Sequence, residues 1–261
     1  MLRDLRLAYL LQQCRAGSDS RRSAYTPLLL NIGNQLSDHM KILIVYAHPE
    51  PRSFNAALKN FAVEILTEAG HAVQVSDLYA MDFNCTGGPD DFLEREDPGF
   101  FAYQREQIHA SAAGLFVPEL KAEMEKLVWA DFVIFQFPLW WFSVPAILKG
   151  WVDRVFAMGF SYNYGQSYEK GIFRGKRAML SFTTGGPPAF YTAEGRNGSI
   201  SDVVWHIQQG MLHFVGMDVL PPFIAYGAAR VAPDQRAAYL EEYRERLLSL
   251  DSTPAIDFKN A

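Results

Sequence analysis

The sequence predicts an α/β fold, a doubly wound parallel sheet of five strands in the order 2-1-3-4-5 with helices on both faces. The first observation is a regular alternation of short apolar runs with segments whose apolar residues recur at helical spacing. This alternation indicates parallel strands joined by helical crossovers. The second is composition: of 261 residues, 49% are hydrophobic and 20% are charged, which is ordinary for a globular domain.

Each predicted strand is an apolar run, and each predicted helix follows from its spacing and its end signals. The predicted strands are residues 41–47, 72–75, 131–137, 177–183 and 219–224, and the predicted helices are residues 53–69, 118–130, 143–158, 199–214 and 233–250. Ser53 is a suitable N-cap for the first helix, and Gly70 ends it. Ser143 and Pro145 are suited to begin the third helix. Residues 80–114 show no strong period and are expected to be an irregular insertion.

Residues 1–39 differ in character from the rest of the chain. They contain five Arg, no Lys and three Asp, and their apolar pieces are too short for a secretory signal. We therefore expect an N-terminal extension outside the fold, followed by one folded domain over residues 40–261.

The bulk properties argue against several classes of function. The formal net charge is -5, whereas a protein that binds nucleic acid usually has a basic face. No apolar run is long enough for an integral membrane segment. Two cysteines, Cys14 and Cys85, are too few for a disulfide framework, which favours a reducing compartment and a cytoplasmic location.

The segment after the third predicted strand presents three consecutive aromatic residues, Trp140, Trp141 and Phe142. In an open α/β sheet, ligands bind at the carboxyl ends of the strands. One or two of these rings could belong to the core, but three in a row cannot all point inward from an extended loop. We therefore expect a wall for a planar, partly polar ligand such as a flavin ring.

The loop after the first strand, residues 48–55, contains no glycine, so it is neither a P-loop nor a dinucleotide fingerprint. It runs into a helix N-terminus, which is a natural site for a phosphate or pyrophosphate. Ser53 and Asn55 add donors, and His48 and Arg52 add positive character. Taken singly, Ser53 could be a simple N-cap and His48 a packed core residue.

The loop after the fourth strand carries Thr183, Thr184, Gly185, Gly186 and Tyr191. The glycines allow a ligand to approach the backbone, and the tyrosine offers a phenol to a carbonyl oxygen. A Gly-Gly pair could also be only a tight turn. However, the loops after strands one, three and four are expected to meet at one sheet edge, and all three carry residues suited to a ligand.

Other groupings of polar residues predict less. His206 and His213 lie seven residues apart on one predicted helix without a Cys, Asp or Glu at metal spacing, so no metal site is expected. Asp153 and Arg154 are expected on a solvated helix face.

From residue 40 to about residue 258 the chain resembles the FAD-dependent NAD(P)H:quinone oxidoreductases of the DT-diaphorase type, whose fold is flavodoxin-like. The segments that carry the resemblance are His48 with Ser53-Phe54-Asn55, residues 76–81, residues 136–151, Phe173-Arg174, residues 183–186 with Tyr191, Ile207-Gln208 and Leu212-His213-Phe214.

The resemblance implies a cofactor and its binding residues. It implies FAD rather than FMN, with NADH or NADPH as the hydride donor. The implied cofactor-binding residues are His48, Ser53, Phe54 and Asn55 for the pyrophosphate side, Pro138, Leu139, Trp140, Trp141 and Phe142 for the ring, and Thr183, Thr184, Gly185, Gly186 and Tyr191 for its polar edge.

The resemblance also implies a homodimer with composite active sites that bind the quinone and nicotinamide substrates. Tyr162 and Tyr164 match two tyrosines that reach across the dimer. The implied substrate-binding residues are Trp141, Phe142, Tyr162, Tyr164, Phe190 and Phe214, and the implied catalytic residues are Tyr191, Asn197, Tyr162 and Tyr164.

The chain departs from the family pattern at three positions. Trp140 replaces a glutamine in the aromatic loop, Asn197 replaces a histidine, and Gln209 replaces a metal-type histidine of one subfamily. The chain also lacks the long C-terminal tail of some members, which leaves the choice between NADH and NADPH open.

These features together predict an NAD(P)H dehydrogenase (quinone) that transfers two electrons as a hydride by a ping-pong mechanism. Three alternatives remain: a flavin-dependent azo or nitroaromatic reductase, an accessory regulatory flavoprotein of a potassium-efflux antiporter, and an electron carrier like flavodoxin. The length of the chain and the substrate-side tyrosines argue against the electron carrier.

Overall fold

The computed structural model describes residues 39–259, in which a parallel sheet is covered by helices on both faces. The strands are β1 Lys41–Tyr46, β2 Ala72–Asp77, β3 Phe132–Pro138, β4 Arg177–Thr183, β5 Asp218–Val219 and β6 Phe223–Ala225. They are ordered β2-β1-β3-β4-β5, every pairing is parallel, and β6 also pairs with β4. The predicted flavodoxin-like order is therefore confirmed.

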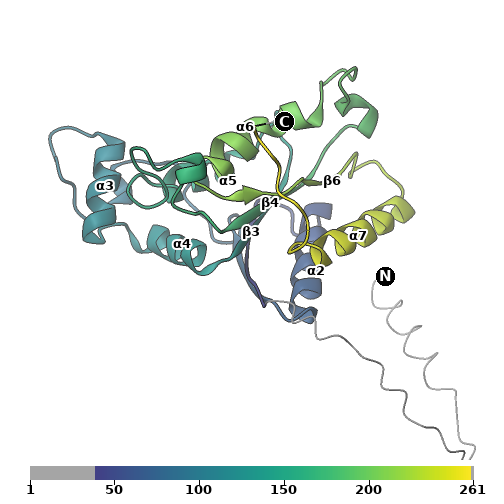
Figure 1. The fold of residues 1–261 in the computed structure, drawn as a ribbon, viewed down its shortest axis with the longest axis horizontal. Coiled ribbons are helices and arrows are strands. Elements are labelled where there is room, and N and C mark those ends of the chain that lie inside the picture. The colour runs from purple at the N-terminus through teal and green to yellow at the C-terminus, as the bar shows by residue number, and fades with distance from the viewer. Residues whose placement is uncertain (1–38, 260–261) are drawn as a thin grey trace, which may run out of the picture. The chain divides into compact units, whose positions relative to one another are not determined.

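Two apolar layers hold the helices to the sheet. The α-helices are α2 Phe54–Glu68, α3 Tyr103–Ala113, α4 Pro118–Trp129, α5 Ala146–Val155, α6 Ile200–Ile207 and α7 Pro233–Leu248. Helices α2 and α7 lie side by side over one face of the sheet, whereas α4, α5 and α6 cover the other face and α3 lies beyond α4 (Figure 1). The predicted extension falls almost wholly in residues 1–38, which lie outside the described residues, and its boundary stays a prediction.

The fifth predicted strand, residues 219–224, is wrong in its middle. It is divided into β5 and β6, which both pair with β4. Pro221 and Pro222 separate the two strands, and because proline has no N–H and a fixed φ it interrupts a sheet ladder.

Two predicted helices also differ from the structure. The helix expected over residues 199–214 ends as α6 at Ile207, and Gln208–His213 form a π-helix, in which Phe214 N–H donates to the Gln209 carbonyl at 3.1 Å. The helix expected from Ser143 begins only at Ala146, after Pro145, and Ser143 does not cap it. The Ser143 backbone is instead used in a tight turn described below.

The insertion, residues 80–114, is more ordered than expected, because it contains α3 and a short 3-10 helix at Pro89–Asp91. Sequence periodicity missed α3 because polar side chains on this helix are buried. Glu106 is 1% exposed and accepts hydrogen bonds from the Glu96 and Asp97 backbone N–H groups at 2.7 and 3.3 Å. Such a helix has no apolar stripe for the pattern to reveal.

Candidate functional site

The loops after β1, β3 and β4 meet at one cavity of about 460 Å³, which we call the sheet-edge cavity. The convergence expected from the sequence is therefore present. Its lining residues are His48, Arg52, Ser53, Phe54, Asn55, Pro138, Leu139, Trp140, Thr183, Thr184, Gly185, Ala228, Ala229 and Arg236. Ten of these are predicted cofactor-binding residues, whereas Trp141, Phe142, Gly186 and Tyr191 are outside the lining.

The first loop combines a helix cap with a neutral histidine. Ser53 Oγ accepts from Ala56 N–H at 3.1 Å, so the simple capping role is real, and the residue also lines the cavity. His48 Nδ1 accepts from Glu50 N–H at 3.0 Å, and burial lowers the pKa of this imidazole. His48 is therefore neutral at pH 7 with its proton on Nε2, which makes Nε2 a donor.

The three aromatic residues sit on a two-residue turn, Trp140–Ser143, which we call the aromatic turn. Trp140 and Ser143 exchange both backbone hydrogen bonds at 3.0 Å, and the two residues between them, Trp141 and Phe142, have φ of 51° and 58°. This pattern is typical of type I′ turns, where Asn and Gly are the usual residues. Bulky aromatic residues in left-handed backbone cost about 1–3 kcal/mol each, a strain that tends to mark functional sites.

The aromatic turn projects its rings outward, as the sequence predicted. Trp141 is 96% exposed, and Trp140 and Phe142 are exposed as well. The Trp140 ring lies 6.2 Å from the His48 ring, on the side of the sheet-edge cavity. Ser143 Oγ lies 3.0 Å from Nε2 of His206 on α6, a contact that no sequence signal indicated.

The loop after β4, residues 183–198, is folded on itself. A Cβ on Gly185 would meet nothing within 4 Å, whereas one on Gly186 would lie 2.8 Å from the Phe190 ring. Asn197 N–H donates to the Phe190 carbonyl at 2.9 Å, and the Tyr191 ring lies 5.8 Å from that of Tyr226. Gly185 thus leaves space in the cavity wall, while a side chain at Gly186 would have to displace the Phe190 ring.

A second concavity, of about 760 Å³, runs along α5, and we call it the α5 groove. Its lining residues are Gly87, Tyr103, Gln104, Gln107, Lys149, Val152, Asp153, Phe156, Tyr162, His206, Gly210, Met211, Phe214 and Val215. The Tyr162 ring packs edge-on against the Phe214 ring, with 5.4 Å between the ring centroids. Gln104 Nε2 donates to the Tyr162 hydroxyl at 3.1 Å. Tyr164 is 84% exposed.

The two concavities share no lining residue. The structure therefore brings together the predicted cofactor residues from three loops, and separately Tyr162 with Phe214. Within one chain it does not place these two groups in a common pocket.

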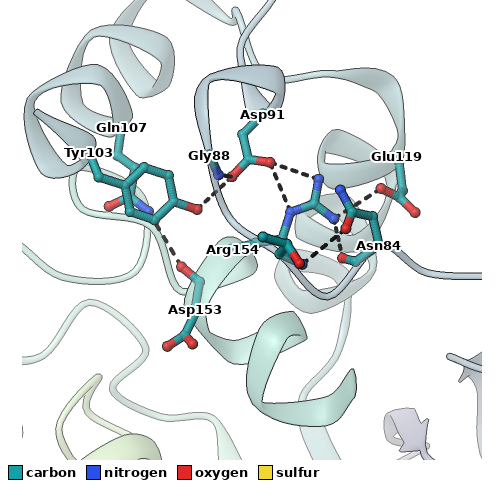
Figure 2. Close-up of polar contacts among 9 residues, drawn as sticks. Asn84, Gly88, Asp91, Tyr103, Gln107, Glu119, Asp153 and Arg154 are labelled. Atoms are coloured by element: carbon teal, nitrogen blue, oxygen red, sulfur yellow. Dashed lines mark hydrogen bonds and ion pairs between the residues drawn. The ribbon is translucent and has the colours of Figure 1, made fainter. Parts of the chain in front are cut away.

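The insertion is fastened to α5 by a buried ion-pair cluster (Figure 2). Arg154 is 2% exposed, its Nε and Nη2 contact Asp91 Oδ1 at 2.9 and 2.8 Å, and its Nη1 lies 3.1 Å from Glu119. Asp91 also accepts from the Tyr103 hydroxyl at 2.5 Å, and burial, then this carboxylate, raises the pKa of the Tyr103 phenol. The expectation that Arg154 is solvated is wrong, because the insertion covers this face of α5.

Gly150 completes this junction. A Cβ there would lie 2.1 Å from the Cys85 carbonyl oxygen, so α5 and the insertion backbone touch at a position that only glycine allows. No sequence pattern predicts this contact, since a glycine within a predicted helix has several explanations.

His206 and His213, which the sequence placed on one predicted helix, have different partners. His206 bonds to Ser143, whereas the His213 ring stacks on Phe258 at 4.8 Å and lies 5.7 Å from Tyr168. Within residues 39–259, no group of three His, Cys, Asp or Glu side chains is placed to hold a metal ion. In the same range, no helix is long and apolar enough to cross a membrane.

The sheet-edge cavity fits a flavin nucleotide by its chemistry. The α2 N-terminus and Arg236 provide a positive environment for phosphate groups, beside Arg52, whose guanidinium is paired with the Glu50 carboxylate at 2.9 Å. Pro138, Leu139 and Trp140 form an apolar wall, and the open position at Gly185 lets a planar group approach the backbone.

Comparison with known proteins supplies relatives over most of the chain. A family model described as flavodoxin-like fold matches residues 40–249. NAD(P)H dehydrogenase (quinone) 1 of Rattus norvegicus is 46% identical over 208 residues, which cover 79% of this chain and 76% of the rat protein. Ribosyldihydronicotinamide dehydrogenase (quinone) of Homo sapiens is 43% identical over 211 residues, which cover 80% of this chain and 91% of the human protein.

Solved structures agree with these relatives. The crystal structure of a protein described as a quinone reductase from Klebsiella pneumoniae is 47% identical, with a TM-score of 0.80 over 83% of this chain and 87% of that one.

Proposed function

This chain belongs to the flavodoxin-like family of NAD(P)H:quinone oxidoreductases, and we propose that it carries a hydride from NADH or NADPH through bound FAD to a quinone. The observation that carries this proposal is the convergence of three strand-end loops on the sheet-edge cavity, beside the outward-facing aromatic turn. FAD is the proposed cofactor, and FMN is the less favoured choice.

The residues of the sheet-edge cavity divide by their chemistry. The α2 N-terminus, Arg236 and the Nε2–H of His48 are suited to the pyrophosphate, because they are cationic or hydrogen-bond donors, whereas Arg52 is already paired with Glu50. When bound, a flavin would supply the hydride chemistry between nicotinamide and quinone, and the quinone with one added proton would leave as the hydroquinone.

Tyr162 in the α5 groove and the exposed Tyr164, two residues further along the chain, are suited to the substrates. Tyr162 and Tyr164 have phenols that can pack on a planar ring and donate to a quinone oxygen. Because Tyr162 and Phe214 line a different concavity from the cofactor residues, we propose a homodimer in which these side chains complete the partner's site. The two substrates then use one pocket in turn, which predicts ping-pong kinetics.

Tyr191 and Asn197 lie on the loop after β4, and we propose that Tyr191 shares charge with the reduced flavin. At the position of Asn197 the family pattern has a histidine. A histidine can take up a proton, whereas the amide of Asn197 can only form hydrogen bonds. Flavin reduction should therefore lack a pH inflection near neutral, and Asn197→His should introduce one.

We propose a cytoplasmic location, which the presence of only two cysteines in the sequence supports.

The test begins with the purified protein, which should be yellow and should release FAD on heating, identified by mass. Turnover of a benzoquinone with NADH and with NADPH should give the parallel double-reciprocal lines of a ping-pong mechanism. A colourless protein that neither flavin reconstitutes would overturn the proposal, and release of FMN alone would overturn the choice of FAD.

A matched assay with an azo dye and a nitroaromatic compound tests the acceptor. We expect quinone turnover to exceed both. If the protein reduces the dye faster than the quinone, it is an azo reductase. If it shows no turnover until a membrane partner is added, it is an accessory flavoprotein.

A further inference from the structure

A row of buried polar side chains lies beneath the sheet-edge cavity. Gln136 on β3 and Ser181 on β4 are fully buried and face each other in register. Asn55 in the first turn of α2 and Thr183 at the end of β4 are 4% and 6% exposed. Ser181 and Thr183 are two residues apart on one strand, so they share the face of the sheet on which α2 packs.

These four side chains form an unbroken series of hydrogen bonds, which we call the polar row. Ser181 Oγ donates to Gln136 Oε1 at 2.6 Å. Gln136 Nε2 donates to Asn55 Oδ1 at 2.9 Å, and Asn55 Nδ2 donates to Thr183 Oγ1 at 2.9 Å. Each amide accepts a hydrogen bond at its oxygen and donates one from its nitrogen. All three bonds therefore run in one direction, from Ser181 toward the cavity.

The direction of the polar row determines what Thr183 can offer. A hydroxyl has a single proton, and the Thr183 oxygen already accepts from Asn55. The proton of Thr183 therefore remains to be donated, and Thr183 lines the sheet-edge cavity. A polarised series of buried bonds is also stronger than its separate members, because each bond strengthens the next in a low-dielectric interior.

The position of Thr183 indicates which part of a ligand it meets. Thr183 is paired with Pro138 in the sheet, and its carbonyl accepts from Leu139 N–H at 2.8 Å. Both neighbours belong to the apolar wall of the cavity, so Thr183 lies between this wall and Asn55 in the first turn of α2. A donor at this place suits an acceptor atom on the ring side of the ligand.

We propose that Ser181 and Gln136 are positioning residues that fix Thr183 as a hydrogen-bond donor to an acceptor atom in the riboflavin part of the cofactor. This inference rests on the proposed flavin binding and adds to it two buried residues that act through a third. Burial of the polar row costs free energy of desolvation. Apolar side chains at the same positions would need no hydrogen-bond partners.

The experiment measures flavin Kd by titration of the apoprotein, with FAD and with riboflavin. Thr183→Val removes the donor and should raise both Kd values by roughly three- to tenfold, the value of one hydrogen bond. Thr183→Ser keeps the hydroxyl and should retain wild-type affinity. Gln136→Met preserves length but breaks the polar row, and it should raise both Kd values by a similar factor.

A double-variant cycle separates positioning from general disturbance. If Gln136 acts through Thr183, the double variant Gln136→Met with Thr183→Val should bind flavin no more weakly than Thr183→Val alone, because the two changes remove one interaction. Gln208→Met is the matched control. Gln208 is also buried, and its Nε2 has no partner among the described residues, so this change should leave flavin Kd unaltered.

Three results would overturn the proposal: an unchanged Kd in Thr183→Val, additive losses in the double variant, or a loss with FAD but not with riboflavin. If Gln136→Met does not fold, Ser181→Ala takes its place in the same cycle. A wild-type protein that binds no flavin would instead refute the proposed function, so the two failures are distinguishable.

Discussion

The sheet-edge cavity is walled by the ends of β1, β3 and β4 and by a helix N-terminus, with satisfied polar groups packed beneath it. The α5 groove is walled by an insertion, by α5 and by a π-helix, and exposed rings stand near it on the aromatic turn and at Tyr164. The first region is lined by ten of the predicted cofactor-binding residues. The second presents apolar surface to solvent, as an interface does before its partner binds.

In the proposed function, the sheet-edge cavity holds the cofactor and the α5 groove receives the substrates. A cofactor that stays bound gains from walls that are rigid before it arrives, because little ordering is then required on binding. Substrates that alternate gain from a surface that a second subunit can close over. Each prediction below asks whether one region can be changed without the other.

The largest effect is expected at Arg154, which holds the insertion that forms one side of the α5 groove. Arg154→Met leaves Asp91 buried without its cation, which should cost about 3–5 kcal/mol. For a domain of this size, Tm should fall by roughly 10 °C. Lys149→Met is the control on the same helix: its pair with Asp153 is half exposed, and Tm should hardly change. Equal losses would mean that the cluster in Figure 2 does not fasten the insertion.

Mixed dimers test whether the substrate side is completed by a second chain. One subunit carries Tyr162→Ala with Tyr164→Ala, and the other carries Trp141→Ala. If the tyrosines act in trans, both defects fall on one site, and activity should be about half of wild type in a two-fold symmetric dimer. Activity as low as in the mutant homodimers would place the tyrosines in cis. FAD content should be normal in the homodimer that carries Tyr162→Ala with Tyr164→Ala.

A smaller effect is expected at the hydrogen bond between Ser143 and His206, which joins the aromatic turn to the α5 groove. Ser143→Ala or His206→Ala should raise the quinone KM about two- to tenfold, the value of one hydrogen bond, with flavin Kd unaltered. His206→Gln can restore the bond and should recover the wild-type KM. A change in flavin Kd instead would show that the two regions are not independent.

The smallest effect concerns acid stability on the cofactor side. Because burial lowers the pKa of His48 from its usual 6.5, the unfolded chain binds a proton that the folded chain does not. Stability is therefore lost as pH falls through 6.5 toward the lowered value. His48→Asn retains an acceptor for Glu50 N–H and should lose less stability over this window, measured by Tm at several pH values. Parallel curves of Tm against pH for the two proteins would contradict this prediction. Burial also lowers the pKa of His71, but this residue is present in both proteins and does not affect their difference.

The fold and the sheet-edge cavity were largely predictable, because both follow from local patterns. Strand alternation determined the sheet order, and the cap at Ser53 and the wall at Trp140 come from residues close in sequence. The errors have the same character. The prediction of one continuous fifth strand was wrong at Pro221-Pro222. The predicted start of α5 was wrong because the Ser143 backbone closes a turn instead of capping a helix.

The substrate side was harder to predict because its contacts join distant segments. Arg154 is buried by a carboxylate 63 residues away, and His206 meets Ser143 across the same separation. The polar row gave a weak signal, a glutamine and a serine within apolar strands, but the direction of its bonds exists only in three dimensions. The homodimer and the roles of Tyr191 and Asn197 remain predictions.

The left-handed backbone at Trp141 and Phe142 has a consequence for anyone who engineers this protein for heat resistance. A stability screen would favour Asn or Gly there, since these residues adopt such φ values without penalty. The improved protein would melt later and would have lost the two exposed rings for which we propose a role in binding. Selection for a higher Tm and selection for turnover therefore favour different residues at these two positions. Variants with a raised Tm should also be tested for quinone reduction before their mutations are combined.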